Sequence, residues 1–258
     1  MNHMSYWMIS TQTLAKREIL RVLRLWKQTI FPSVITTVLY FGIFGFVLGE
    51  RVGSVDGVPY IQFVAPGLVM LALTVNSFSN SAFSLFIEKF HRSLEELLSS
   101  PVNNHQIILG FVLGGVFRGM LCALTVWLTT WYFAGYLLAY PGLFIFSCLL
   151  SSTVFSLMGM VNALVARNFD DLNVTTTLLL SPLVMLGGVF YSVNMLDAFW
   201  QQVAWLNPLL YVGNLFRYCL VGVANISSIL VISVLIGLMI FFYAVAYWLM
   251  TATTYVRK

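Results

Sequence analysis

The sequence predicts an all-α polytopic membrane protein with six transmembrane helices. Its 258 residues are 60% apolar and 9% charged, with a mean hydropathy of +0.90, whereas a soluble domain is roughly 45–50% apolar and about 25% charged. The apolar residues gather in six runs, and each run has the roughly 20 residues with which an α-helix crosses a bilayer. The runs are 29–49, 61–85, 107–134, 141–165, 172–191 and 227–250.

Residues 1–28 form an N-terminal segment ahead of the transmembrane domain at 29–258. Two stripes at helical spacing run through residues 10–28, one of Arg17, Arg21, Arg24 and Gln28 and the other of Ile19, Val22, Leu23 and Trp26. They predict an amphipathic helix in the interface of the inner leaflet, with its cations near anionic head groups. An ordinary helical cap on the cytoplasmic face is the alternative.

Lys and Arg are unevenly divided between the two sides of the predicted bundle. Arg51 and Arg217 fall on one side, and ten cations fall on the other: Lys16, Arg17, Arg21, Arg24, Lys27, Lys89, Arg92, Arg167, Arg257 and Lys258. By the positive-inside rule, both termini and the connection between the second and third runs are cytoplasmic.

The fifth run is expected to bend or break, because it contains Pro182 and the pair Gly187 and Gly188. The segment after it is rich in Trp, Tyr and Phe, which favour the membrane interface. We therefore expect short helices half-inserted at the outer face. Residues 206–224 could instead form a seventh span, but Arg217 and the cytoplasmic C-terminus oppose this alternative.

The six runs contain no Asp, Glu or His. This absence disfavours a proton- or sodium-coupled carrier, which needs an intramembrane carboxylate to bind its ion. Arg118 is the one charged residue within a run. It is predicted either to meet a head group or a partner carboxylate, or to contact substrate or a gate.

Motifs for catalysis, metal binding and nucleotide binding are absent. The chain has no GxSxG, HExxH, CxxC or GxxxxGK[ST]. His3, His91 and His105 are isolated in polar stretches, where each is expected to be a solvated side chain. We therefore predict no catalytic residues, no metal site and no cofactor in this chain. The net charge of +4 lies beside the apolar runs rather than in a basic patch, so no nucleic-acid partner is expected.

The stretch 86–106, FIEKFHRSLEELLSSPVNNHQ, carries much of the charge of the chain. Its pattern predicts one helix over 86–99, ended by Ser-Ser-Pro-Val, with Glu88, Arg92 and Glu96 spaced for ion pairs. A second face of this helix is apolar and consists of Ile87, Phe90, Leu94, Leu97 and Leu98. Such a helix is expected to dock a partner protein, and packing only on its own membrane domain is the alternative.

Several motifs, in order over nearly the whole chain, resemble the ABC-2 type permeases of ABC transporters, and among them the YadH-like exporter permeases of the bacterial inner membrane. The motifs are QFVAPGLVM, KFHRSLEELLSSPV leading into IILGFVLGGVFRG, NFDDLNVTTTLLLSPLVMLGGVFYSVNML, and FWQQVAWLNPLLYVGNLFRY. The resemblance implies the architecture of a type V ABC exporter, with six spans per chain, a homodimer, and two copies of a separate ATPase subunit that binds ATP and Mg.

The resemblance also assigns residues. It makes the stretch between spans two and three the coupling helix that enters the ATPase, here Glu88, Lys89, Arg92, Leu94, Glu95, Glu96 and Pro101. Gly187, Gly188 and Phe190 match the signature at which span five breaks into re-entrant helices. The family exports polysaccharides, lipids, drugs and haem-related compounds, so the substrate does not follow.

We place the translocation route between spans one, two and five of two protomers, lined by Phe41, Phe44, Phe63, Asn76 and Tyr191. The abundance of Met, Phe and Trp suits a lipid, a lipid-linked glycan or a drug-like amphiphile, and suits helix packing equally well.

Two other classes of function are the alternatives. A passive channel or scramblase would need no ATPase and no docking helix. A membrane-embedded enzyme would need polar catalytic groups, of which Asp170 and Asp171 are the few available. That pair could bind a cation or cap a helix.

Overall fold

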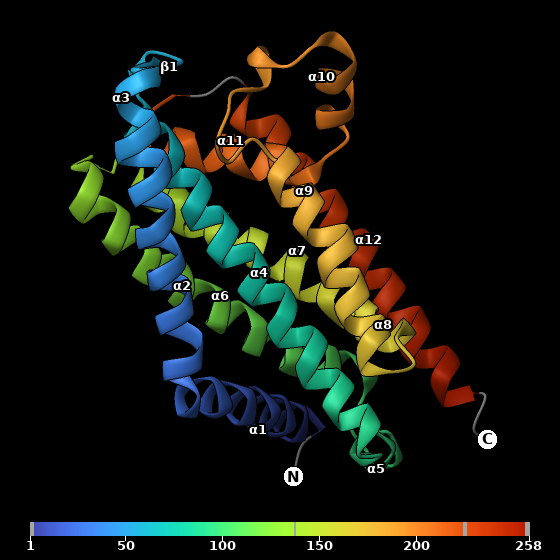
Figure 1. Cartoon of the computed structure of the whole chain (residues 1–258). Coiled ribbons are helices and arrows are strands. Elements are labelled where there is room, and N and C mark those ends of the chain that lie inside the picture. The colour runs from blue at the N-terminus through green and yellow to red at the C-terminus, as the bar shows by residue number, and fades with distance from the viewer. Residues whose placement is uncertain (1–2, 137, 224–225, 256–258) are drawn as a thin grey trace.

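The computed structural model describes residues 3–136, 138–223 and 226–255, and these form a tilted helical bundle (Figure 1). Arg257 and Lys258, used above for orientation, lie outside this part. The elements in order are α1 (His3–Arg24), α2 (Trp26–Tyr40), η1 (Phe41–Leu48), α3 (Gly49–Val52), β1 (Ser54–Val55), β2 (Val58–Pro59), α4 (Tyr60–Phe90), α5 (Ser93–Ser99), α6 (Asn104–Ala134), α7 (Pro141–Val165), α8 (Phe169–Val174), η2 (Thr175–Leu180), α9 (Ser181–Leu186), η3 (Val193–Met195), α10 (Ala198–Trp205), α11 (Pro208–Val221) and α12 (Ser228–Tyr255).

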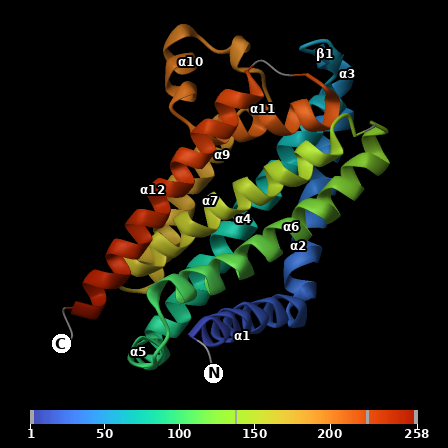
Figure 2. The same ribbon diagram turned by 180° about the vertical axis from the view of Figure 1, so that it is seen from behind.

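The bundle has two ends. One, called the α5 end, holds α1, α5, α8 and the C-terminal end of α12, and the other, called the α10 end, holds α3, the β1–β2 hairpin, α10 and α11 (Figure 1). Seen from one side, α2, α4 and the α8–α9 path form the near layer (Figure 1). Seen from behind, α6, α7 and α12 are nearest (Figure 2).

Five helices in the described residues are long and apolar enough to cross a membrane. They are Trp26–Val52, Tyr60–Phe90, Asn104–Ala134, Pro141–Val165 and Ser228–Ala252. The predicted run 172–191 is not among them, so a sixth crossing stays a prediction. This run falls on α8, η2 and α9, which follow one another without a gap between α7 and the α10 end.

The run breaks at its glycine pair and not at Pro182, because helix continues through Pro182 as far as Leu186. Residues 175–180 just before it are a π-helix, in which the Ser181 N–H donates to the carbonyl of Thr176. A wider π turn relaxes the clash that a proline ring makes with the preceding turn. The chain leaves the helix at Gly187 and Gly188, and Gly188 has a φ of +72° that suits glycine.

Short helices follow, as predicted. The residues proposed as a seventh span form α11, which has 14 residues and is too short to cross a bilayer. It is largely buried at the α10 end, and Arg217 within it is only 6% exposed. Arg217 is therefore a packed residue of a short helix.

The N-terminal helix packs more deeply than its stripes predict. Helix α1 lies against α6, where Leu14 and Glu18 meet Gly110 and Gly114, and a methyl group at either glycine would collide with them. In the predicted apolar stripe, Val22 is buried, but Leu23 and Trp26 are exposed. In the predicted basic stripe, Arg21 is only half-exposed. The two predicted stripes are thus wrong in detail. Arg21 turns inward because it pairs with Glu18 and donates to Ser84 and Asn80.

His105 is also more ordered than the sequence predicts. Its Nδ1 lies 2.6 Å from the hydroxyl of Tyr243, and its ring stacks on Tyr247 at 4.5 Å. Asn104 donates to the hydroxyl of Thr251 nearby (3.3 Å). These contacts fix the start of α6 to α12, so the prediction of a solvated His105 is wrong.

The centre of the bundle is α4, packed between α6 and α7. Glycine and serine residues let these helices approach closely: Gly115 faces Ser81 and Ser156, Gly119 faces Ser77, and Gly159 faces the backbone of Phe78. Inside a membrane, where burial from water does not drive helices together, such small residues provide the contact.

We expect Gly159→Ala to lower the thermal midpoint of the detergent-solubilised protein. The added methyl would meet the backbone carbonyl of Phe78, which cannot rotate away, and overpacking of a core costs about 1–3 kcal/mol. Gly237→Ala is the matched control, because nothing lies within 4 Å of its added methyl. Thermal midpoints from heating followed by size-exclusion chromatography test this, and equal midpoints for the two variants would contradict the close contact.

Candidate functional site

The predicted partner-docking helix is a separate short helix at one end of the bundle. Helix α4 ends at Phe90, and α5 begins at Ser93. Between them Arg92 has left-handed backbone (φ 61°), which turns the chain. The prediction of one helix over 86–99 is therefore wrong, because a left-handed residue cannot continue an α-helix. Among the described residues the expected ion pairs of Arg92 with Glu88 and Glu96 do not form.

Two of the predicted coupling residues hold α5 to the bundle instead of facing outward. The Lys89 ammonium donates to the carbonyls of Ala163 (3.3 Å), Leu164 (2.8 Å) and Ala166 (2.7 Å) at the C-terminal end of α7. A cation there also meets the negative end of the helix dipole. Lys89 thus fixes the end of α4 to the end of α7.

Glu88 makes the second connection. Its carboxylate lies 3.2 Å from the guanidinium of Arg17 in α1 and accepts a short hydrogen bond from the Ser93 hydroxyl at the start of α5. One carboxylate therefore joins α1, α4 and α5. The pair with Arg17 is partly exposed, so its Coulomb contribution is modest, and its main effect is to fix geometry.

Glu18 of α1 is buried beside this carboxylate, and no pattern in the sequence predicts a role for it. It pairs with Arg21 (2.9 Å), accepts from the Ser84 hydroxyl (2.7 Å), and is 2% exposed. Arg21 donates to Ser84 and also to the Asn80 side chain (3.2 Å). Burial lowers the pKa of Arg21, and the charge of Glu18 opposes that change. A charge buried here is tolerated because it is paired and hydrogen-bonded.

The remaining predicted coupling residues form the outer surface. Arg92, Glu96 and Pro101 are exposed, Glu95 is half-buried, and Leu94 is buried under the helix. Beside α5 lies a groove of about 440 Å³ lined by Phe86, Lys89, Phe90, Arg92, Glu95 and Arg167. We call α5 and this groove the α5 surface.

Arg167 lines the groove of the α5 surface and Phe169 lies beside it, although the sequence pattern predicted neither residue there. The Phe169 ring packs on Phe86 (4.8 Å) and Phe90 (5.2 Å), which brings α8 against the end of α4. Phe90 itself is 61% exposed. The sequence feature that could have indicated both residues is the polar turn ARNFDD, in which Arg167 serves above only to predict the orientation.

The turn before α8 shows how Asp171, one member of the acidic pair, is used. Asn168 caps the helix by accepting from the Asp171 N–H (2.7 Å), and Asp171 accepts from the Arg167 N–H (3.0 Å). Asp171 therefore acts in capping. Nowhere in the described part do three or more His, Cys, Asp or Glu side chains gather as metal ligands would.

The residues predicted to line a route are divided between packing and surface. Phe41 and Phe63 are each 1% exposed, so they pack the bundle and the prediction that they line a route is corrected. Phe44 stacks on Phe190 at 4.2 Å, and Tyr191 is half-buried next to them. Asn76 does reach an open groove.

The predicted signature glycines form a structural joint at the α10 end. The Arg217 guanidinium donates to the carbonyl of Gly188 and lies 4.1 Å from the centre of the Phe63 ring. Gly67 of α4 faces the backbone of Val189 so closely that a methyl group would lie 2.9 Å from it. These contacts hold the end of α9 against α4 and α11.

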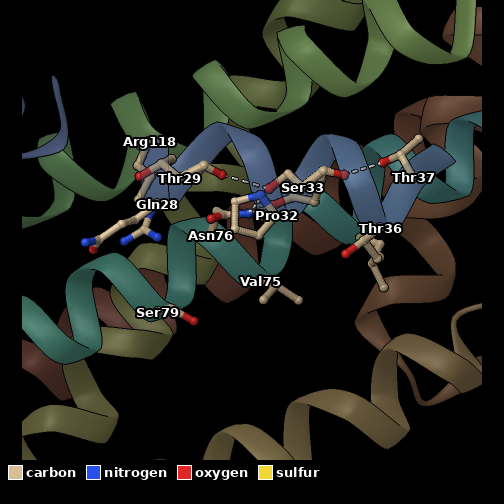
Figure 3. Close-up of a pocket in the computed structure, with 12 residues that line it drawn as sticks. Gln28, Thr29, Pro32, Ser33, Thr36, Thr37, Val75, Asn76, Ser79 and Arg118 are labelled. Atoms are coloured by element: carbon tan, nitrogen blue, oxygen red, sulfur yellow. Dashed lines mark hydrogen bonds between the residues drawn. The ribbon is translucent and has the colours of Figure 1, made fainter. Parts of the chain in front are cut away.

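The open groove lies between α2 and α4 and has a volume of about 320 Å³. Its polar lining is Gln28, Thr29, Ser33, Thr36, Thr37, Asn76 and Ser79, and Arg118 of α6 closes it at the Gln28 end (Figure 3). Asn76 donates to Ser33 (3.2 Å) and to the Ala72 carbonyl (2.9 Å), which fixes its orientation.

Comparison with known proteins assigns the family. The family model described as ABC-2 type transporter matches residues 9–221. The inner membrane transport permease YadH of Escherichia coli K12 is 38% identical over 242 residues, which cover 94% of both chains. Nodulation protein J of Rhizobium leguminosarum bv. viciae is 27% identical over 214 residues, which cover 78% of this chain and 80% of that one. Nodulation protein J of Rhizobium meliloti is 26% identical over 234 residues, 88% and 87% of the two chains. The chain therefore belongs to the ABC-2 type transporter family.

Proposed function

We propose that this chain is the permease subunit of an ATP-driven exporter in the inner membrane, that it works as a homodimer, and that a separate ATPase subunit docks on each copy. The family and the permease relative support a transport role. The observation that carries the coupling is the α5 surface, a partly exposed helix and groove connected through Glu88 and Lys89 to α1, α4 and α7. ATP and Mg would be bound by the ATPase, and both termini and the α5 end would face the cytoplasm.

The α5 surface has the chemistry of a docking site. Arg92 and Glu96 are exposed on it and can form ion pairs with a partner, which set specificity and encounter rate. Phe90 exposes an aromatic ring at the edge of the same groove, and aromatic residues with arginine are enriched in protein interfaces.

The connections behind the surface would carry a movement into the membrane. A displacement of α5 moves Glu88 and Lys89, and through them α1 and the end of α7. When two ATPase subunits close on nucleotide, we expect α2, α4 and the 169–186 helix to reorient around the dimer axis and open the route outward.

The homodimer is placed on the layer formed by α2, α4 and η2. Exposed apolar side chains occur on both sides of the α2–α4 groove, such as Leu39 of α2 (61%) and Leu178 of η2 (71%). A second copy across this layer would enclose the groove and complete a route between the two chains. A symmetric contact of this kind is the commonest in homo-oligomers.

A passive channel or scramblase remains the rival function. It would not need the α5 surface, so the two proposals differ in what α5 variants do. A membrane-embedded enzyme loses support because Asp171, one of its few candidate groups, is engaged in capping.

The docking role predicts loss of the partner when charges on α5 are reversed. We expect the tagged wild-type chain to co-purify an ATPase subunit in mild detergent, and the double variant Arg92→Glu, Glu96→Lys to lose most of it. Arg51→Glu is the matched control, since Arg51 is exposed and lies near the opposite end. If neither the wild type nor the control brings an ATPase, the passive alternative replaces this proposal.

The connecting role predicts that Lys89→Met separates docking from coupling. This change keeps the length of the side chain but leaves three carbonyls of α7 without their donor, and a buried polar group without a partner costs about 1–3 kcal/mol. We expect the ATPase still to co-purify, while ATP hydrolysis no longer responds to the permease and the thermal midpoint falls. Lys16→Met, at an exposed lysine of α1, should change neither. Normal coupling in Lys89→Met would contradict the connection.

The dimer face can be located by cross-linking. Cys122, Cys148 and Cys219 are buried, so a membrane-permeant bismaleimide should react mainly with an added cysteine. We expect cross-linked dimers with Leu39→Cys and with Leu178→Cys. Trp248→Cys on α12, equally exposed at 67%, should give none. Dimers formed only by the α12 variant would place the interface on the opposite face.

A further inference from the structure

The groove between α2 and α4 combines a cation with a polar wall, in a part of the chain where charge is otherwise scarce. Arg118 is the only charged side chain within the six apolar runs of the sequence. Because an intramembrane charge is costly, it usually faces a partner or a polar pathway.

Arg118 has no such partner among the described residues. In residues 3–136, 138–223 and 226–255 it forms no ion pair and no hydrogen bond, and its Nε is buried without an acceptor. The acidic residues of this region are already used, because Glu18 pairs with Arg21 and Glu88 pairs with Arg17. The described acidic residues near Arg118 are thus engaged with other cations, which leaves its guanidinium available to a ligand.

The groove offers further donors next to Arg118. Gln28 lies beside it, and the hydroxyls of Thr36 and Ser79 line the same space (Figure 3). A guanidinium presents paired N–H groups that match two oxygens of a phosphate or carboxylate, and such charge-assisted bonds are stronger than neutral ones. Pro32, Leu71 and Val75 give the groove an apolar part as well.

The position of Arg118 suits a head group. It meets the groove at Gln28, the third residue of α2, just after the turn at Leu25 that follows α1. Helix α1 is amphipathic and carries exposed cations, including Arg24, near that turn. Beyond Gln28, α2 exposes Phe31 and Ile35, along which an acyl chain could lie.

We infer that the α2–α4 groove binds the anionic head group of an amphiphile, with Arg118 paired to its phosphate or carboxylate. This inference rests on the proposed transport function, and it names the class of cargo as an acidic lipid or lipid-linked molecule that enters from the leaflet at the α5 end. The soluble anion alone would lack the apolar contacts with Val75 and α2.

The test is a titration of the purified full-length chain in neutral detergent with dioleoyl phosphatidic acid, followed by native mass spectrometry. We expect the wild type to bind phosphatidic acid more tightly than phosphatidylcholine. Arg118→Gln should weaken phosphatidic acid at least about tenfold, the loss typical of one charge-assisted pair, and Arg118→Lys should recover part of it. Arg51→Gln, which removes an exposed charge near the other end, should bind as the wild type does.

A second variant keeps the test decisive if Arg118→Gln does not fold. Val75→Phe fills the groove without touching the charge and should weaken phosphatidic acid by a similar factor. Unchanged binding in both variants, or equal binding of phosphatidylcholine, would overturn the inference. Inorganic phosphate in tenfold excess should not displace the lipid, and complete displacement would overturn the assignment to an amphiphile. No step needs the ATPase, so failure here is distinct from failure of the co-purification.

Discussion

The close approach of α4 to α6 and α7 is the contact on which the other features depend. The backbones meet where Gly115, Gly119 and Gly159 leave room for serine side chains and for the backbone of Phe78. In a membrane this contact depends on van der Waals packing, since apolar side chains gain little by leaving lipid for protein. Because α4 is held on two sides, its two ends become fixed points. One end carries Glu88 and Lys89 toward α5, and the other places Gly67 and Phe63 against the joint at Gly188.

Polar chemistry in this chain is concentrated where helices end. At the α5 end, Lys89 satisfies carbonyls that α7 leaves unpaired, and Glu18, Glu88, Arg17 and Arg21 neutralise one another between α1 and α4. At the α10 end, Arg217 satisfies the carbonyl of Gly188. Each of these cations donates to backbone or carboxylate oxygens that would be costly to bury without a partner. Arg118 differs, since it forms no hydrogen bond and no ion pair within the described residues. Because of this contrast, we assign the groove to a ligand and not to packing.

Much of the fold could be predicted from the sequence, and the candidate site only in part. Five of the six predicted runs fall on helices able to span a membrane, because length and apolar content alone set that property. The candidate site falls on the stretch of chain that the sequence singled out, but some of its residues face outward and others hold α5 to the bundle. The sequence shows that Glu88 and Lys89 are charged neighbours on a predicted helix. It could not show that both side chains turn inward, since their partners come from α1 and α7. The prediction that Phe41 and Phe63 line a route was wrong for the same reason. An aromatic residue in a span gives the same sequence pattern whether it packs against other helices or lines a route.

The sequence by itself determined the membrane class, the helical content, the predicted orientation and the stretch available to a partner. Each of these follows from local composition and charge, because each segment enters the bilayer or stays outside it according to its own residues. Only the tertiary structure decided the turn at Arg92, the passage of helix through Pro182, the burial of Glu18 and Arg217, and the unpaired state of Arg118. The burial of Glu18 and Arg217 depends on which side chains meet between separate helices, as with Arg21 and Ser84. Pairings between distant parts of the chain leave no periodic trace in a single sequence.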